Sequence, residues 1–207
     1  ILDRDGTLNV DRDDYVKSAD EFEPLPGALE AIAQLNHAGF FVAVATNQSG
    51  LGRGLFDMAA LNAMHSKMNK LLAAVGGRID AVLFCPHSPE ESCACRKPLP
   101  GLYEQIGERL GLPLHDVPVV GDSLRDLQAA VVVGAQPHLV LTGKGASLRG
   151  QPLPANYPAQ TMVHQDLAAF VAHILHLAPD GGPEGDLSRG GPGSPPSGRS
   201  CIWPGWV

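Results

Sequence analysis

Long apolar runs, aromatic side chains and positive charge are all scarce in this sequence of 207 residues. It has no run of about eighteen apolar residues, the length that a transmembrane helix requires. Aromatic residues make up 5% of it, and 15 lysines and arginines stand against 22 acidic residues, for a net charge of −7. A protein that binds nucleic acid usually has a basic face or aromatic side chains that stack on the bases. We therefore expect neither a membrane nor a nucleic-acid partner, whereas small phosphorylated substrates stay open because a metal ion can help to bind them.

Cysteine is also scarce, and an initial methionine is lacking. Three of the four cysteines, Cys85, Cys93 and Cys95, lie close together, and Cys201 stands alone. Clustering beside a histidine favours metal binding over disulfides and fits a reducing compartment, so we expect a cytoplasmic protein. The sequence opens on Ile1-Leu2, which has the character of a strand end, and we expect that a few N-terminal residues are missing. Nothing in it points to a signal peptide.

An apolar content of 44% is enough for one domain with a substantial core. Apolar runs alternate with segments of helical periodicity, which predicts an α/β fold with a doubly wound parallel sheet and right-handed crossovers. Strands are expected at residues 40–45, 79–84, 117–120, 138–141 and 162–164. Helices are expected at residues 27–39, 57–75, 101–110, 126–133 and 166–177, and loops at residues 9–26 and 143–158. The loop at 9–26 is too short for a lid, so no large cap domain is predicted.

The composition changes at residue 178, after which Gly, Pro and Ser dominate. Such a segment cannot bury enough apolar surface to fold. We therefore expect a domain at residues 1–177 and a disordered tail at residues 178–207. The apolar end from Cys201 to Val207 indicates no role. We interpret the tail as a frame-shifted or readthrough terminus, with a docking peptide as the alternative.

Two carboxylates near the start of the chain, Asp3 and Asp5, are its most informative feature. If Ile1-Leu2 ends a strand, both lie at its carboxyl end, where open α/β sheets bind ligands. Residues two apart in a strand share a face, so both would point into one site. They suit Mg²⁺, and also a division of labour in which one attacks and the other moves protons. A surface turn is the alternative, because Asp, Arg and Gly favour turns.

A second group of polar residues has the composition of a metal site. Cys85-Pro86-His87 and Cys93-Ala94-Cys95 place three thiols and one imidazole within eleven residues. That set suits tetrahedral Zn²⁺, and four protein ligands leave no open position, so the zinc would be structural. It would order a loop that ends in Arg96-Lys97. Reduced core cysteines with a surface histidine are the alternative.

Three later segments join the first pair of carboxylates in a recognisable order. They are Ala45-Thr46-Asn47, Cys95-Arg96-Lys97-Pro98, and Val120-Gly121-Asp122-Ser123 followed by Asp126. Together the four resemble the motifs of the haloacid dehalogenase superfamily of phosphohydrolases, over roughly residues 1–177. The resemblance implies a Rossmann-like sheet and Mg²⁺-dependent phosphate hydrolysis.

The resemblance also implies catalytic roles. Asp3 matches the nucleophile, which would form an aspartyl-phosphate, and Asp5 the general acid and base. Asp3, the backbone carbonyl of Asp5, and Asp122 would hold Mg²⁺. Thr46 would offer its hydroxyl to the phosphoryl oxygens, and Lys97 would balance charge in the transition state.

The role of Asp126 is open at this point. It would either bind the metal through a water molecule or orient Lys97, and the alternative is an exposed acidic residue on a helix without a catalytic role.

Within the superfamily, two segments narrow the resemblance. The run Thr46-Asn47-Gln48-Ser49-Gly50-Leu51-Gly52-Arg53-Gly54 and the zinc loop resemble the D-glycero-D-manno-heptose 1,7-bisphosphate 7-phosphatase family, whose members serve bacterial lipopolysaccharide and glycoprotein synthesis. Histidinol-phosphate phosphatases share the zinc loop and are the alternative, although they typically carry Asp where this chain has Ser49. Some heptose enzymes have Lys in place of Ser123, which leaves the contacts to the second phosphate and the anomer preference open.

The resemblance finally implies the lining of the substrate cleft. The residues are Asp11, Arg12, Asp13, Asp14, Tyr15, Asn47, Gln48, Ser49, Arg53, Arg96 and Ser123. Arg53 and Arg96 suit a second phosphate, because a guanidinium binds phosphate through two hydrogen bonds; ordinary surface arginines are the alternative. The expected partner is a small phosphorylated sugar, the expected cofactors are catalytic Mg²⁺ and structural Zn²⁺, and a monomer is expected.

Two other classes of protein share part of this pattern. DNA 3′-phosphatase modules carry the superfamily motifs, but this sequence has no basic channel. A non-catalytic binding protein scaffolded by zinc would have no reason to keep Asp3 and Asp5 alongside Thr46, Lys97 and Asp122. The sequence therefore predicts an enzyme, a phosphoric monoester hydrolase.

Overall fold

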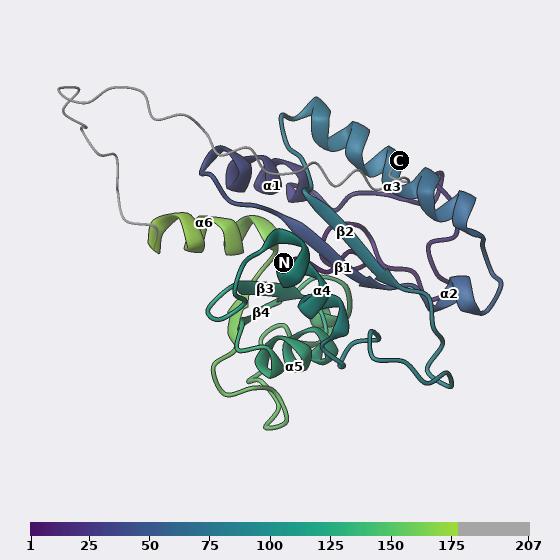
Figure 1. Ribbon diagram of the computed structural model, residues 1–207. Helices are drawn as coiled ribbons and strands as arrows, with labels where there is room; N and C mark the ends of the chain where they lie inside the picture. Colours follow the sequence, from purple (N-terminus) through teal and green to yellow (C-terminus); the bar gives the residue numbers. More distant parts are fainter. Residues whose placement is uncertain (178–207) are drawn as a thin grey trace, which may run out of the picture.

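A parallel β-sheet forms the middle layer of the protein in the computed structural model, which describes residues 1–177 (Figure 1). Its strands are β1 (Ala43–Asn47), β2 (Ala81–Cys85), β3 (Pro118–Gly121), β4 (Gln136–Val140) and β5 (Met162–His164). β1 pairs with β2, and β4 lies between β3 and β5, all in parallel. The tail at residues 178–207, including Cys201, lies outside the described residues.

The first three residues join the two halves of the sheet. Leu2 forms parallel bridges to Val44 on β1 and to Val120 on β3. The backbone bonds are Leu2 N to Ala43 O at 2.8 Å and Asp3 N to Val120 O at 2.8 Å. Numbered along the chain with this segment first, the spatial order of the strands is 3-2-1-4-5-6, which is an order typical of the doubly wound sheet that the sequence predicted. Ligands bind such sheets where the strand order reverses, which is beside Asp3.

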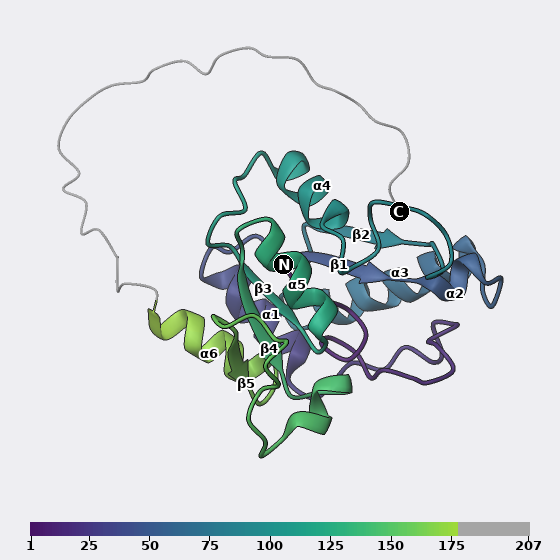
Figure 2. The ribbon, with the colours of Figure 1, turned by 90° about the horizontal axis from the view of Figure 1, so that it is seen from below.

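Helices cover both faces of the sheet (Figure 2). The helices are α1 (Ala28–His37), α2 (Ser49–Gly52), α3 (Met58–Ala74), α4 (Gly101–Leu110), α5 (Leu124–Val132) and α6 (Leu167–Leu177), with a 3₁₀ helix, η1 (Gly143–Leu148). α1, α3 and α6 pack on one face, and α4 and α5 on the other. None of the helices in residues 1–177 combines the length and apolar character needed to cross a membrane.

Side chains that alternate along residues 42–45, at the start of β1, belong to two different cores. Val42, just before the strand, and Val44 pack with the α1, α3 and α6 layer. Ala43 and Ala45 pack with the α4 and α5 layer. A strand that is buried on both faces reads as a continuous apolar run, which is why this strand could be predicted from the sequence.

Helix starts follow the capping residues. The Asp57 side chain accepts the Ala60 backbone N–H at 2.8 Å, and the Asp166 side chain accepts that of Ala169 at 2.8 Å. Ser123 and Asp126 form a capping box at the start of α5. α5 therefore begins at Leu124, two residues before the predicted start at Asp126, because the cap lies before the acid.

Several element ends differ from the predictions. The strand predicted at residues 40–45 begins only at Ala43, and the Phe41 side chain before it is exposed. β1 also continues to Asn47, so Thr46 lies inside the strand. β2 starts at residue 81 where 79 was predicted, and β4 at residue 136 where 138 was predicted. The glycine-rich segment after β1 contains α2, and the predicted loop at 143–158 opens with η1, two short turns whose composition carries no helical periodicity.

Candidate active site

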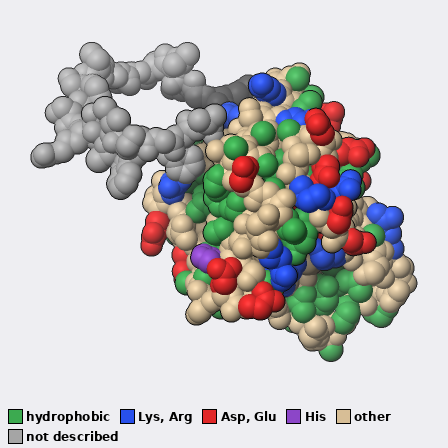
Figure 3. All heavy atoms as spheres, turned by 90° about the vertical axis from the view of Figure 1, so that its right-hand side faces the viewer, with side chains coloured by type: hydrophobic (Ala, Val, Ile, Leu, Met, Phe, Trp, Pro, Cys, Tyr) green, Lys and Arg blue, Asp and Glu red, His purple; other side chains and the backbone are tan. Residues whose placement is uncertain are grey.

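A cleft of about 270 Å³ opens at the carboxyl ends of the strands. It is lined by Asp3, Asp5, Asp11, Arg12, Asp13, Tyr15, Val16, Thr46, Asn47, Gln48, Ser49, Arg96, Lys97, Asp122, Ser123, Arg125, Asp126 and Lys144. Acidic and basic side chains lie close together on one face of the molecule (Figure 3). The four predicted motifs therefore meet in one cleft, and the surface-turn interpretation of Asp3 and Asp5 is wrong.

A tight turn brings the first motif against the third. Gly6 has φ of 82°, which side chains rarely adopt, and a Cβ there would collide with the Asp122 carboxylate. Thr142, after β4, donates from its hydroxyl to the Gly6 carbonyl at 2.6 Å. The Lys144 backbone N–H donates to Asp122 Oδ2 at 2.8 Å. These contacts fix the distance between Asp122 and Asp3.

Lys97 is the central cation of the site, and the residue is 2% exposed. Its Nζ donates to Asp3 Oδ1 at 2.8 Å, to Asp126 Oδ1 at 2.6 Å and to the Ala45 carbonyl at 2.7 Å. Burial alone would lower the pKa of Lys97, but the carboxylates of Asp126 and Asp3 raise it overall. These contacts favour the charged form of Lys97, and all three N–H donors of its ammonium group are used.

Asp126 orients Lys97 and is not an exposed helix acid. It is buried, and its Oδ2 accepts the Ser123 backbone N–H at 3.1 Å and the Ser123 hydroxyl at 2.7 Å. One carboxylate thus caps α5 with one oxygen and holds Lys97 with the other.

Three carboxylates share this pocket with a single ammonium. Asp3, Asp122 and Asp126 offer oxygens that all lie within 4.8 Å of one another. Burial, followed by the charge of Asp126, raises the pKa of Asp3 to about 6, and burial and the charge of Asp3 raise that of Asp122 to about 8. A divalent cation would relieve this repulsion, and carboxylate oxygens are the ligands that Mg²⁺ prefers. The donor set therefore fits the predicted metal.

The second carboxylate of the first motif has a different environment. Asp5 accepts hydrogen bonds from Arg4, from Asn9 Nδ2 at 2.9 Å and from Gln48 Nε2 at 3.0 Å. Burial would raise the pKa of Asp5, but Arg4 and these donors together lower it. Gln48 also donates to Thr46 Oγ1 at 2.8 Å, so Asp5 and the predicted phosphoryl contact at Thr46 share one amide.

The four predicted zinc ligands come together beside the cleft. Cys85 Sγ lies 3.0 Å from Cys95 Sγ, 3.9 Å from Cys93 Sγ and 3.4 Å from His87 Nδ1, and all four ligand atoms lie within 4.8 Å of one another. Tetrahedral zinc thiolates would have sulfur atoms about 3.8 Å apart. Burial and the Cys95 sulfur raise the pKa of the Cys85 thiol to about 12, so a cation would be needed to hold it as a thiolate. The set fits structural Zn²⁺.

The cysteine loop is connected to the catalytic centre by short contacts. The Arg96 backbone N–H lies 3.4 Å from Cys93 Sγ, and Arg96 Nη1 donates to the His87 carbonyl at 3.2 Å. The next residue, Lys97, exchanges two backbone hydrogen bonds with the Asn47 side chain, at 3.0 and 3.1 Å. The loop and β1 thus hold Lys97 from both sides.

Comparison with known proteins gives consistent matches. Residues 94–170 match the HAD-hydrolase-like family profile, and residues 1–123 match the polynucleotide kinase 3 phosphatase profile. The D-glycero-beta-D-manno-heptose-1,7-bisphosphate 7-phosphatase of Bordetella bronchiseptica is 54% identical over 178 residues, which are 86% of this chain and 98% of the relative. That of Pseudomonas aeruginosa is 50% identical over 175 residues, 84% of this chain and 96% of the relative. The chain belongs to the D-glycero-β-D-manno-heptose-1,7-bisphosphate 7-phosphatase family.

A solved member of this heptose-bisphosphate phosphatase family has the same fold. The crystal structure of the B. bronchiseptica enzyme, complexed with magnesium and phosphate, is 54% identical, with a TM-score of 0.80 over 84% of this chain and 96% of that one. The Burkholderia thailandensis enzyme is 52% identical, with a TM-score of 0.62. The predicted superfamily, fold class and lack of a large cap are therefore confirmed for residues 1–177.

Two residues predicted for the cleft of a heptose-bisphosphate phosphatase do not line it. The Asp14 carboxylate instead accepts from Arg12 Nε at 3.0 Å and from Lys17 Nζ at 2.9 Å. Arg53 lies at the surface, 3.4 Å from Glu90. Arg53 is the C-cap residue of α2, a short helix that was not predicted.

Three charged residues in the cleft or directly behind it were missed by the sequence analysis. Lys144 Nζ donates to Asp11 Oδ2 at 2.6 Å, across the mouth of the cleft. Arg125 faces Arg96, whose pKa is lowered by burial and then by this second guanidinium. Arg4 is fully buried behind Asp5. The position of Arg4 between Asp3 and Asp5 was visible in the sequence. The sequence could not reveal that its side chain is buried behind Asp5.

Proposed function

We propose that this protein is a Mg²⁺-dependent phosphatase that removes the 7-phosphate of D-glycero-β-D-manno-heptose 1,7-bisphosphate and leaves the 1-phosphate. The observation that carries the proposal is the constellation of Asp3, Asp5, Lys97 and Asp122 in a chain about half identical to enzymes named for this reaction. The β anomer is taken from the names of those relatives.

The proposed chemistry has two steps. An oxygen of Asp3 attacks the phosphorus, the bond from phosphorus to the C7 oxygen breaks, and that oxygen takes a proton from Asp5. Asp5 then removes a proton from a water molecule, whose oxygen attacks the phosphorus of the aspartyl-phosphate and releases Asp3. Lys97 keeps the attacking carboxylate oriented, at 2.8 Å. Mg²⁺, held by Asp3, Asp122 and the Asp5 carbonyl, would neutralise charge on the phosphoryl oxygens.

The cleft supplies the remaining proposed contacts. Thr46 would donate its hydroxyl to a phosphoryl oxygen. The sugar and the second phosphate would contact Asp11, Arg12, Asp13, Tyr15, Asn47, Gln48, Ser49, Arg96 and Ser123, all of which line the cleft, and we add Arg125 and Lys144 to this set. Asp14 and Arg53 are left out because they do not line it. An open cleft without a cap must hold its substrate by such polar contacts.

We also propose that Zn²⁺ has a structural role. The protein would be cytoplasmic and would act in the synthesis of bacterial heptose and lipopolysaccharide precursors. Zn²⁺ would bind Cys85, His87, Cys93 and Cys95 and would position Arg96 and Lys97. A monomeric state stays a prediction.

The deciding experiment measures kcat/KM for phosphate release from four compounds: the heptose bisphosphate, histidinol phosphate, p-nitrophenyl phosphate and a 3′-phosphorylated oligonucleotide. Activity should require Mg²⁺, be lost with EDTA and be highest on the bisphosphate, with phosphorus NMR showing the 1-phosphate as product. Asp3→Asn should abolish turnover while the fold is kept. Higher kcat/KM on histidinol phosphate or on the oligonucleotide would make the proposed substrate wrong, and a fully active Asp3→Asn protein would overturn the mechanism.

A further inference from the structure

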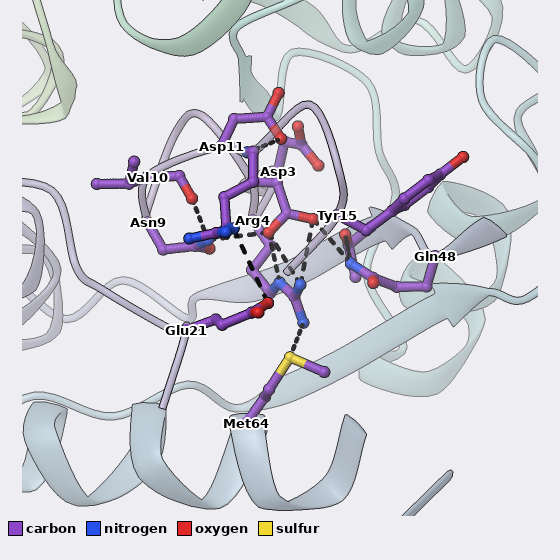
Figure 4. A network of polar contacts seen from close by, with 12 residues as sticks. Asp3, Arg4, Asn9, Val10, Asp11, Tyr15, Glu21, Gln48 and Met64 are labelled. Atoms are coloured by element: carbon purple, nitrogen blue, oxygen red, sulfur yellow. Dashed lines mark hydrogen bonds and ion pairs between the residues drawn. The ribbon is translucent and has the colours of Figure 1, made fainter. Parts of the chain in front are cut away.

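Arg4 stands between the two catalytic carboxylates but points away from the cleft. Its side chain is completely buried and extends toward Met64 on α3, as Figure 4 shows. A buried guanidinium is costly unless it is paired. Among the described residues, the carboxylate that pairs with Arg4 is that of Asp5. The position of one of the two carboxylates is therefore tied to a charge in the core.

The contacts of Arg4 distinguish the two oxygens of Asp5. Oδ1 accepts from Arg4 Nε at 3.0 Å, from Arg4 Nη2 at 2.9 Å and from Asn9 Nδ2 at 2.9 Å. Oδ2 accepts from Gln48 at 3.0 Å and, at the longer distance of 3.2 Å, from Arg4 Nη2. Oδ2 therefore has fewer and longer hydrogen bonds than Oδ1, and through Gln48 it is linked to Thr46.

Arg4 is itself held from behind by α3. Its Nη1 lies 3.1 Å from His65 Nε2 and 4.0 Å from Met64 Sδ, and its guanidinium carbon lies 6.0 Å from the centroid of the Phe22 ring. A guanidinium has donors only, so His65 Nε2 must be the acceptor, and the imidazole must be neutral with its proton on Nδ1. Burial and the charge of Arg4 also lower the pKa of His65 to about 4, in agreement with that tautomer.

We infer that Arg4, anchored by His65, is a positioning residue that fixes the Asp5 carboxylate so that Oδ2 exchanges the proton with the substrate. In the first step, Oδ2 would give its proton to the leaving oxygen, and in the second it would take one from the attacking water. The inference rests on the proposed phosphatase function and adds to it two residues that do not contact the substrate. His65 is 61 residues from Arg4 in the sequence, so the arrangement depends on the packing of α3.

The test compares leaving groups, because a core residue that only stabilises the fold would affect all substrates alike. p-Nitrophenolate departs without a proton, whereas a sugar alkoxide needs one from Asp5. Because hydrolysis of the aspartyl-phosphate is the same for all substrates, the comparison uses kcat/KM, which reports the steps up to phosphoryl transfer to Asp3. Arg4→Met should lower kcat/KM for sugar and other alkyl phosphates by about 100-fold, within the range that general acid catalysis contributes, and for p-nitrophenyl phosphate by less than about 10-fold. Arg4→Lys keeps the charge but not the two-pronged geometry, and it should fall between Arg4→Met and wild type.

A second pair of variants keeps the inference testable if Arg4→Met does not fold. His65→Leu removes the acceptor behind Arg4 and should lower the ratio of alkyl to aryl kcat/KM by roughly 3- to 10-fold, the effect of one hydrogen bond. His65→Gln can accept the same bond through its side-chain oxygen and should restore most of that ratio. All variants are compared at equal Mg²⁺ concentration, with circular dichroism and zinc content as folding controls.

The outcomes separate the two hypotheses. A selective loss of kcat/KM on alkyl phosphates, restored by His65→Gln, supports the inference. Equal loss of kcat/KM on alkyl and aryl substrates in folded Arg4 and His65 variants, or no loss in either, overturns it. If wild-type protein hydrolyses other alkyl phosphates but not the heptose bisphosphate, the proposed substrate is wrong, and the ratio still decides the role of Arg4.

Discussion

Two arginines near the cleft have different environments, and this difference leads to a prediction at the scale of single residues. Arg96 lines the cleft, is partly buried and faces Arg125. Arg53 is paired with Glu90 at the surface. Arg96→Ala should therefore reduce kcat/KM for the bisphosphate by roughly 10- to 100-fold, the value of a charge-assisted hydrogen bond to phosphate. Its effect on p-nitrophenyl phosphate, which has no second phosphate, should be about 3-fold or less.

Arg53→Ala is the matched control for Arg96→Ala, because it removes the same side chain from the neighbouring surface. It should leave kcat/KM for both substrates within about 2-fold of wild type, since exposed ion pairs contribute little. A large loss on the bisphosphate in Arg53→Ala, with little in Arg96→Ala, would reverse the assignment of the two arginines.

The residues that meet in the cleft could be predicted, while their supporting contacts could not. Asp3, Lys97 and Asp122 each follow a strand end or a recognisable loop, and Thr46 is the last residue but one of β1, so short motifs suffice to find them. Lys144 contacts Asp11 across 133 residues of sequence, and such pairings arise only from the fold. Arg53 shows the converse, because a residue inside a matching motif lies at the surface, at the end of a helix of four residues.

At the scale of elements, the loop at residues 85–98 should depend on zinc for its conformation. Cys93→Ser should lower zinc content, measured by mass spectrometry of the purified protein, and reduce kcat by roughly 10-fold or more. The physical reason is that Cys93 contacts the Arg96 backbone, and Arg96 precedes Lys97. Adding Mg²⁺ should not restore activity, because Mg²⁺ does not bind thiolates well.

A suitable control for Cys93→Ser is Ser88→Ala, which alters the same loop without removing a predicted zinc ligand. It should retain zinc. Freshly purified wild-type protein without zinc, or a Cys93→Ser protein with full zinc content and activity, would contradict the structural-zinc assignment.

A cluster of histidines between β4, β5 and α6 predicts a dependence of stability on pH. His138 Nδ1 lies 3.0 Å from His164 Nε2, and Phe170 and His173 pack against both rings. Burial and the neighbouring His164 lower the pKa of His138 to about 3, and burial and His173 lower that of His164 to about 4. The unfolded chain takes up these protons near pH 6.5, whereas the folded protein does so only near pH 3 to 4.

The sign of the effect follows from proton uptake. Between about pH 6.5 and 4 the unfolded state binds more protons, so the free energy of unfolding rises with pH and is lost as the pH falls through this window. Each histidine contributes a slope of up to about 1.4 kcal/mol per pH unit. His164→Gln should show a shallower slope than wild type in urea unfolding at pH 7.5 and 5.5. His115→Gln, at an exposed position, should match the wild-type slope.

The comparison with wild type is needed because Asp3 and Asp122 also titrate in this range, and their raised pKa values act in the opposite direction. An unchanged slope in His164→Gln would show that the cluster does not limit acid stability.

The elements themselves were largely predictable, and their ends were not. α3 begins after Asp57 and α4 at Gly101, as the capping and proline signals indicated. β1 begins three residues after its predicted start, because apolarity extends to Phe40-Phe41 whereas strand pairing does not. Pairing depends on the neighbouring strand, which a run of apolar residues does not reveal.

At the scale of the whole molecule, the predicted site residues lie within the part of the chain that the structure describes. Asp3, Asp5, Asp122, Lys97 and the four predicted zinc ligands belong to residues 1–177. The net charge of −7 is compatible with a small anionic substrate because Arg96, Arg125 and Lys144 line the cleft beside its carboxylates, and a divalent cation would add further positive charge. Composition could not reveal this local arrangement.

The domain boundary at residue 177 remains a prediction from composition, and truncation tests it. A chain that ends at residue 177 should keep kcat/KM within about 2-fold of the full chain, because no residue assigned to the site lies beyond it. Its free energy of unfolding should change by about 0.5 kcal/mol or less, as for surface changes that remove no packed contact. Thermal and urea unfolding of both chains at equal Mg²⁺ and zinc content would measure this. A fall in Tm of about 5 °C or more would show that residues 178–207 pack on the domain, because a loss of that size corresponds to roughly 1 to 2 kcal/mol in a chain of this length.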